Sequence, residues 1–279
     1  MTDSIFPYAR WTERLATLRE RFAAAQPFPH VVLDEFLAPD AAQRCVRAFP
    51  PLETDGWIHY THFNEYKFGQ PDRHRFPPDV GAVVDELNSP SFVEFLGALT
   101  GIRGLLADAG LMGGGLHQSP VGGYLNVHAD FTGHPHEPSW RRRLNLLLYL
   151  NPGWQDSYGG FLELWDSRME RCVHRIAPAF NRAVVFCTDA DAFHGHPDPL
   201  TCPPGVTRRS VALYYFTAER EPFRVHATHY RARPGEGAKA VPIWLDMLAL
   251  RVFDGMKRRF GLSDRVGSDV LKRVWPRHR

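Results

Sequence analysis

The residues with the clearest capacity for chemistry are His128 and Asp130, which are separated by one residue in the stretch GGYLNVHADF. Residues two apart on an extended strand point to the same side, so an imidazole nitrogen and a carboxylate oxygen can reach one ion. With a second histidine from a distant strand, they would form a 2-His-1-carboxylate site with open metal positions, an arrangement that suits iron(II). Since the chain has 14 histidines, one such triplet is also expected by chance. A second one, His196-Pro197-Asp198, is the poorer candidate because proline disfavours a paired strand.

The third ligand is expected downstream, just beyond another strand. The segment RAVVFCTDADAFHGHP offers His194 and His196, which are also two residues apart. Either imidazole could reach the metal, and these residues alone leave the choice open. The alternative interpretation is that one or both are surface histidines in a turn.

A candidate anion site follows at Arg208-Arg209-Ser210. Arg208 and Ser210 share one face of a strand, and a guanidinium can hold a carboxylate through two parallel hydrogen bonds while a hydroxyl adds a third donor. An acidic co-substrate would bind there. The competing interpretation is an exposed arginine pair on an edge strand, since most arginines lie at the surface.

Short strands must position these groups. Alternation in Arg143–Leu150 predicts a strand with Leu144, Leu146, Leu148 and Leu150 on one face and Arg143, Asn145, Leu147 and Tyr149 on the other. Further strands are expected at 161–165, 182–187 and 210–216. Strands without helical crossovers favour a sandwich or barrel. The first hundred residues indicate helices: one with Trp11, Leu15, Leu18 and Phe22, and others after Pro39, over 79–87 and from Ser89-Pro90 to Gly101.

Composition narrows the function classes. The 279 residues are 44% hydrophobic with a net charge of +2, so no nucleic-acid partner is expected. No apolar stretch has the length of a membrane span, no signal peptide is recognised, and the four cysteines form no CxxC pair, so we expect a cytoplasmic protein with reduced thiols. The segment 231–279 carries 12 Lys/Arg against 5 Asp/Glu. Its helical stripe, Leu245 to Phe260, would dock on a partner or pack within the molecule.

Taken together, the motifs resemble the iron(II)/2-oxoglutarate-dependent oxygenases, specifically the prolyl-4-hydroxylase-like branch. The resemblance spans roughly Gly113 to Thr217, and its pieces come in the family's order. They are His128-Ala129-Asp130, the RRLNLLLYLNPGW block, GGFLELWD, the FHGHP block from Phe193, and Arg208-Arg209-Ser210 followed by VALYYF.

The resemblance implies an α+β, mainly β fold: a double-stranded β-helix, or jelly roll, flanked by N-terminal helices and a C-terminal helix. Together with the residue patterns outside the matched stretch, it suggests a helical region at 1–104, the oxygenase core at 105–230 and a basic helical tail at 231–279. The helical N-terminal region, including NEYKF at 64–68, would then form a lid. Helices in the first region are expected to pack on the core.

Site roles also follow from the resemblance. His128, Asp130 and His194 would bind Fe(2+), with His194 preferred over His196 because the family's distal histidine usually follows a small and an aromatic residue. Arg208 would hold the far carboxylate of 2-oxoglutarate, assisted by Tyr149 and Ser210, and Leu162 would line that slot. Tyr124 lies four residues before His128, one more than in relatives, which leaves its role open.

The implied activity is a dioxygenase that uses O2 and 2-oxoglutarate, with ascorbate as a further cofactor candidate. It would hydroxylate an unactivated C–H bond and release succinate. Peptidyl proline, an amino acid and a small metabolite are the substrate classes left open. The alternative is a non-catalytic cupin- or lectin-like jelly roll that binds a metal or ligand.

Overall fold

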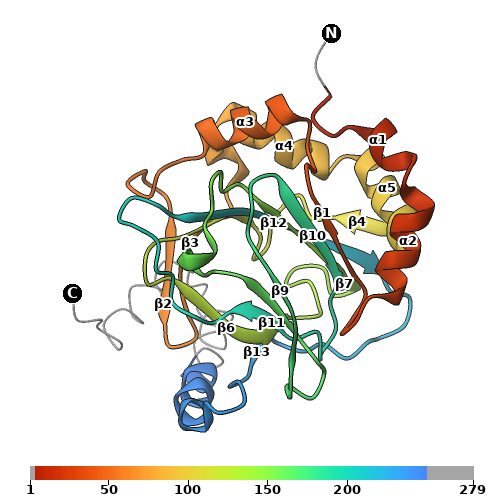
Figure 1. Ribbon diagram of the computed structural model, residues 1–279. Coiled ribbons are helices and arrows are strands. Elements are labelled where there is room, and N and C mark those ends of the chain that lie inside the picture. Colours follow the sequence, from red (N-terminus) through yellow and green to blue (C-terminus); the bar gives the residue numbers. More distant parts are fainter. Residues whose placement is uncertain (1–3, 250–279) are drawn as a thin grey trace.

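The computed structural model describes residues 4–249. The helices of the first hundred residues lie together on one side of the molecule, and a further helix at residues 240–249 lies away from them (Figure 1). The helices of the N-terminal group are α1 (Tyr8–Thr12), α2 (Leu15–Ala24), α3 (Pro39–Ala48), α4 (Pro78–Leu87) and α5 (Pro90–Thr100). The start of α5 follows its sequence signals: the Ser89 side chain accepts a hydrogen bond from the Phe92 amide at 3.2 Å. The end of α5 also follows its sequence signal, since Gly101 takes the left-handed conformation at φ 75°.

The described strands form one curled antiparallel sheet of thirteen strands. Along its main path the order is β1-β10-β7-β12-β5-β3-β6-β11-β8-β9. The fold is therefore the expected α+β jelly roll. The strands are β1 (His30–Leu33), β2 (Ile58–His62), β3 (Glu65–Gln70), β4 (Leu105–Ala107), β5 (Gly115–Ser119), β6 (Tyr124–Ala129), β7 (Trp140–Tyr149), β8 (Leu162–Trp165), β9 (Cys172–Ile176), β10 (Arg182–Cys187), β11 (His194–His196), β12 (Arg208–Ala218) and β13 (His229–Tyr230).

Strand β7 separates the helix-packed core from the interior of the jelly roll. Leu144, Leu146, Leu148 and Leu150 belong to the main hydrophobic core together with the buried faces of the helices. Tyr149 belongs to a second cluster inside the curl, against which Leu147 packs. The alternation expected for this strand is confirmed from residue 144 onward.

A β-bulge changes the pattern before residue 144. Tyr215 pairs with Leu144 but Phe216 pairs with Arg142, so Arg143 is an extra residue on β7. The bulge turns Arg142 inward, where its side chain is 0% exposed, while Arg143 is 34% exposed and faces Glu219. The expectation that Arg143 shares the inner face with Tyr149 is therefore wrong.

The N-terminal hundred residues hold strands as well as helices. β1 extends the sheet beside β10, and β3 pairs with both β5 and β6 in the middle of it. The stretch 64–68 thus belongs to the sheet and to the β2–β3 turn, so the expectation that it is part of a helical region is wrong. The lid role of the N-terminal region stays a prediction. The proposed boundaries of the three regions stay a prediction.

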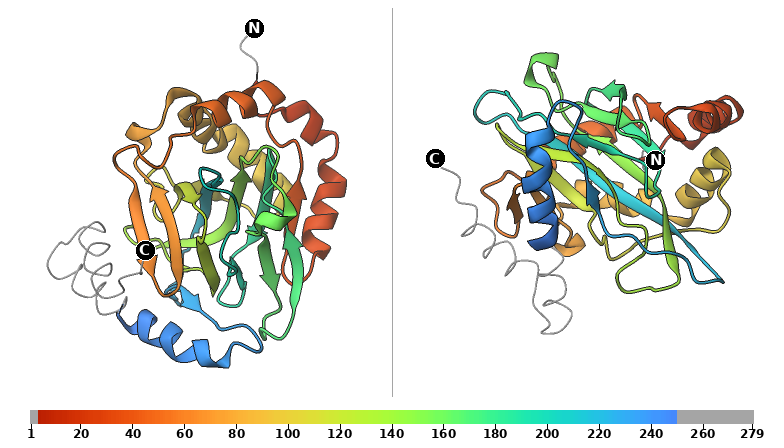
Figure 2. Two further views of the ribbon diagram at one scale, coloured as in Figure 1. Left: turned by 60° about the vertical axis from the view of Figure 1, so that its left-hand side comes forward. Right: turned by 90° about the horizontal axis from the view of Figure 1, so that it is seen from below.

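The C-terminal helical residues 240–249 lie beside the β2–β3 hairpin (Figure 2). Asp246 is 1% exposed there, and its carboxylate lies 2.7 Å from His62 Nδ1. The Asp246 side of this segment packs within the molecule, whereas Leu245 and Leu248 of the expected stripe are 47% and 44% exposed. The rest of the stripe lies outside the described residues. Between residues 4 and 249, no helix is long and apolar enough to cross a membrane.

Candidate active site

Three side chains that could ligate a metal converge at one end of the jelly roll. His128 on β6 is paired directly with His194 on β11, and Asp130 follows the end of β6. Nε2 of His128 lies 3.4 Å from one Asp130 carboxylate oxygen, and Nε2 of His194 lies 3.4 Å from the other. One ligand atom from each residue falls within 4.8 Å of the others. A single ion can therefore contact all three.

Both imidazoles are held in the tautomer that a metal requires. Nδ1 of His128 lies 2.9 Å from the Asn126 carbonyl, and Nδ1 of His194 lies 2.9 Å from the Ala192 carbonyl. Because a carbonyl only accepts, each Nδ1 carries the proton and each Nε2 presents its lone pair toward Asp130. Burial lowers the pKa of His194 to about 4, which keeps the ring neutral at pH 7.

Asp130 is fixed from behind by two residues of β7. Its Oδ2 accepts hydrogen bonds from Arg142 Nη2 at 3.0 Å and from Asn145 Nδ2 at 2.7 Å. Burial tends to raise the pKa of Asp130, but Arg142 and the two histidines outweigh it, and the pKa lies well below its usual range. The guanidinium of Arg142 also lies 3.4 Å from the centre of the Tyr214 ring. Sequence reasoning missed Arg142, since only the bulge identifies it among three successive arginines.

Arg208 is a buried cation inside the jelly roll that has no carboxylate partner among the described residues. Arg208 is 6% exposed, its Nε donates to the Gly160 carbonyl at 2.8 Å, and its Nη2 donates to the Tyr149 hydroxyl at 3.3 Å. Within residues 4–249, no acidic group forms an ion pair with it. A buried, unpaired charge is costly, so this guanidinium is suited to an incoming anion.

The other residues expected around Arg208 are also inside. Ser210 is 4% exposed and pairs with Tyr149 across β12 and β7, and Leu162 is 2% exposed in the same cluster as Tyr149. Tyr124, whose role the sequence leaves open, donates from its hydroxyl to the Phe63 carbonyl at 3.1 Å. That contact places its hydroxyl at the β2–β3 turn.

A search of known families matches residues 114–216 to the 2OG-Fe(II) oxygenase superfamily. The match covers the strands that carry His128, Asp130, His194 and Arg208. The segment 114–216 therefore carries the sequence pattern of a 2OG-Fe(II) oxygenase domain. No curated protein sequence matches it significantly.

Solved structures of prolyl hydroxylases are also similar to this chain. A prolyl hydroxylase from Trichoplax adhaerens, solved with a peptide of the hypoxia inducible factor oxygen degradation domain, matches 75% of this chain and 92% of its own at 17% identity, with a TM-score of 0.54. A Pseudomonas putida prolyl-4-hydroxylase matches 73% of this chain and 100% of its own at 20% identity, with a TM-score of 0.45. A Phytophthora capsici prolyl 4-hydroxylase matches 78% of this chain and 70% of its own at 17% identity, with a TM-score of 0.49. The Trichoplax match establishes the shared architecture.

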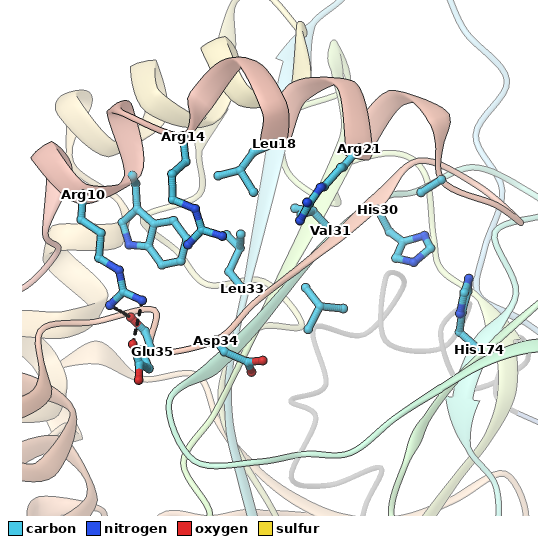
Figure 3. Close-up of a pocket in the computed structure, with 13 residues that line it drawn as sticks. Arg10, Arg14, Leu18, Arg21, His30, Val31, Leu33, Asp34, Glu35 and His174 are labelled. Carbon is cyan, nitrogen blue, oxygen red and sulfur yellow. Dashed lines mark hydrogen bonds and ion pairs between the residues drawn. The ribbon is translucent and has the colours of Figure 1, made fainter.

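The surface has a small cavity that includes Asp130 of the candidate site and a larger groove away from that site. The small cavity, of about 90 Å³, touches Asp130. It is lined by the end of β6, the loop before β11, and the segment before and in β13: Ala129, Ala190, His226, Ala227 and His229. A larger groove of about 540 Å³ lies between helices α1–α2 and strand β1 and includes the Arg10–Glu35 ion pair (Figure 3). The groove contains none of the site residues, so size does not identify the site here.

Proposed function

We propose that this protein is an oxygenase that uses iron(II), O2 and 2-oxoglutarate to hydroxylate an unactivated C–H bond. The observation that carries the proposal is the convergence of His128, Asp130 and His194 on one point. The superfamily match and the buried, unpaired Arg208 add to it.

The donor set fits iron(II). Two neutral imidazoles and one carboxylate are the facial set that leaves other metal positions open. His128 and His194 would bind through Nε2 and Asp130 through Oδ1, because Oδ2 is already held by Arg142 and Asn145. A bound iron(II) supplies the redox chemistry by which O2 converts 2-oxoglutarate to succinate and carbon dioxide and oxidises the substrate. The protein's part is to orient both molecules and to exclude water.

The co-substrate would be held through its far carboxylate. Arg208 offers a guanidinium to it, and the Tyr149 hydroxyl and Ser210 lie on the same face of the sheet. Leu162 closes the apolar side of the slot. A cupin- or lectin-like binding module gives no reason for an unpaired arginine at this position.

Peptidyl proline is the first substrate to test, because the Trichoplax protein of the same fold is a prolyl hydroxylase solved with a peptide. Free amino acids and small metabolites are the alternatives. Ascorbate as a reductant and the cytoplasm as the location stay expectations from the sequence.

The test is succinate release from 2-oxoglutarate by the iron-loaded protein, with pools of proline-containing peptides, amino acids and metabolites. A product that gains one oxygen identifies the substrate class by mass. Absence of 2-oxoglutarate binding and turnover with every pool, while iron binds, would contradict the proposed function.

A further inference from the structure

One row of the sheet crosses the interior of the jelly roll opposite the metal-binding residues. The pairing of β7, β12, β5 and β3 places Tyr149, Ser210, His117 and Gly69 side by side in that row. A Cβ atom on Gly69 would lie 3.7 Å from the His117 ring and only 2.8 Å from the Tyr60 ring. The glycine thus leaves room for the Tyr60 ring, and the His117 imidazole lies next to it in the same row as Tyr149 and Ser210.

The polar atoms of His117 are buried without partners in the described structure. Both ring nitrogens are inaccessible to solvent and form no well-aligned hydrogen bond, although the Gly113 backbone lies close enough to raise the pKa of the ring. Burial lowers the pKa of His117 to about 3; the positive charges of Lys67 and Arg208 add to this effect, and the Glu65 carboxylate opposes it. A buried donor without an acceptor is costly, and here its surroundings favour an anion.

A second unpartnered imidazole comes from the opposite wall. His196 is 5% exposed, lies on β11 two residues beyond His194, and has no hydrogen-bond partner for its Nδ1 in residues 4–249. Gly195, between them, is pressed against the β6 backbone, where a Cβ would come within 2.8 Å of the Leu125 carbonyl oxygen. His196 is not part of the group that converges with Asp130. Its Nδ1 is a buried polar atom without a partner next to the candidate metal site, and in the tautomer protonated there it can donate a hydrogen bond.

We propose that His117 and His196 are co-substrate-binding residues, each donating a hydrogen bond to 2-oxoglutarate. The inference rests on the proposed function. It adds two hydrogen-bond donors for 2-oxoglutarate to those proposed for Arg208, Tyr149 and Ser210. His117 shares a row with Ser210 and so belongs with the far carboxylate. His196 follows the proposed ligand His194 and so belongs with the end of the molecule nearer the metal.

The experiment measures the dissociation constant of 2-oxoglutarate by calorimetry on the Mn²⁺-loaded protein, in which binding is read without turnover. His117→Leu and His196→Val remove the donors, and His117→Asn keeps one. The control is His74→Gln, an exposed histidine outside the site. A hydrogen bond to a charged group contributes enough that each loss should weaken binding about tenfold or more, with the Mn²⁺ affinity unchanged. His117→Asn should recover much of the loss.

Wild-type affinity for 2-oxoglutarate in His196→Val and His117→Leu would overturn the inference. Loss of Mn²⁺ binding in His196→Val would also overturn it, because His196 would then be a metal ligand. If His117→Leu does not fold, the His196→Val and His117→Asn measurements still decide. A wild-type protein that binds Mn²⁺ but no 2-oxoglutarate would instead refute the proposed function.

Discussion

The most informative perturbation is the removal of the cation behind Asp130. Arg142→Met keeps an unbranched side chain as far as the position of Nε but deletes the guanidinium, with its charge and its contact with the Tyr214 ring. Arg142 is fully buried, and its ion pair with Asp130 spans 3.0 Å. Removing one partner of a buried ion pair leaves the other charge uncompensated and costs about 3–5 kcal/mol.

The neighbouring arginine provides a matched control. Arg143 is 34% exposed and lies 3.5 Å from a partly exposed Glu219 carboxylate. Pairs of this kind contribute about 0–1 kcal/mol, so Arg143→Met should change the free energy of unfolding very little. Both substitutions delete one positive charge from adjacent positions, which removes net charge as an explanation of any difference.

The assay is urea unfolding of the metal-free protein, with the midpoint and slope compared between the two variants. We expect a much lower midpoint for Arg142→Met and a near-wild-type midpoint for Arg143→Met. Saturating Mn²⁺ should recover part of the loss in Arg142→Met, because the ion replaces the missing charge beside Asp130. Equal stabilities of the two variants would refute the argument that the β7 bulge selects Arg142 to hold the carboxylate.

Two further outcomes are expected. In the first, Arg208→Ala should weaken 2-oxoglutarate binding at least about a hundredfold in calorimetry, since two hydrogen bonds to a charged acceptor contribute about 1.5–3 kcal/mol each. The control Arg209→Ala should bind 2-oxoglutarate as the wild type does, because the Arg209 Nε contacts Thr207. Similar losses in both variants would reject this strand register. In the second, burial alone would lower the pKa of His62, but Asp246 and Glu65 outweigh it and raise the pKa to about 9. The stabilisation of the fold by protonated His62 is therefore complete below about pH 6.5 and is lost as the pH rises through about 9. In Asp246→Asn, the unfolding midpoint should fall less over this pH range. An unchanged pH profile in this variant would contradict the His62–Asp246 contact.

The elements that the sequence predicts well are those set by local physics. Ser89 and Gly101 bound α5 because a side-chain cap and a left-handed glycine act within one helical turn. The leucines of β7 alternate because one face meets the helices and the other meets the interior. The candidate site residues His128, Asp130 and His194 carry their own chemical signature.

The features that the sequence does not predict depend on distant pairing. β3 carries Glu65 and Lys67, a charged pair that looks like a surface pattern until the strand is inserted between β5 and β6. The choice between Arg142 and Arg143 depends on one extra residue in the ladder, which no local propensity specifies. The burial of Asp246 against His62 joins positions 184 residues apart.

The central claim is that two histidines and one aspartate hold iron(II) while 2-oxoglutarate binds beside it. The direct measurement is the visible absorption of the anaerobic protein after addition of iron(II) and 2-oxoglutarate. We predict a weak charge-transfer band in the wild type that persists in His196→Val at saturating 2-oxoglutarate and disappears in His128→Ala and His194→Ala. An unchanged band in both alanine variants would contradict the account.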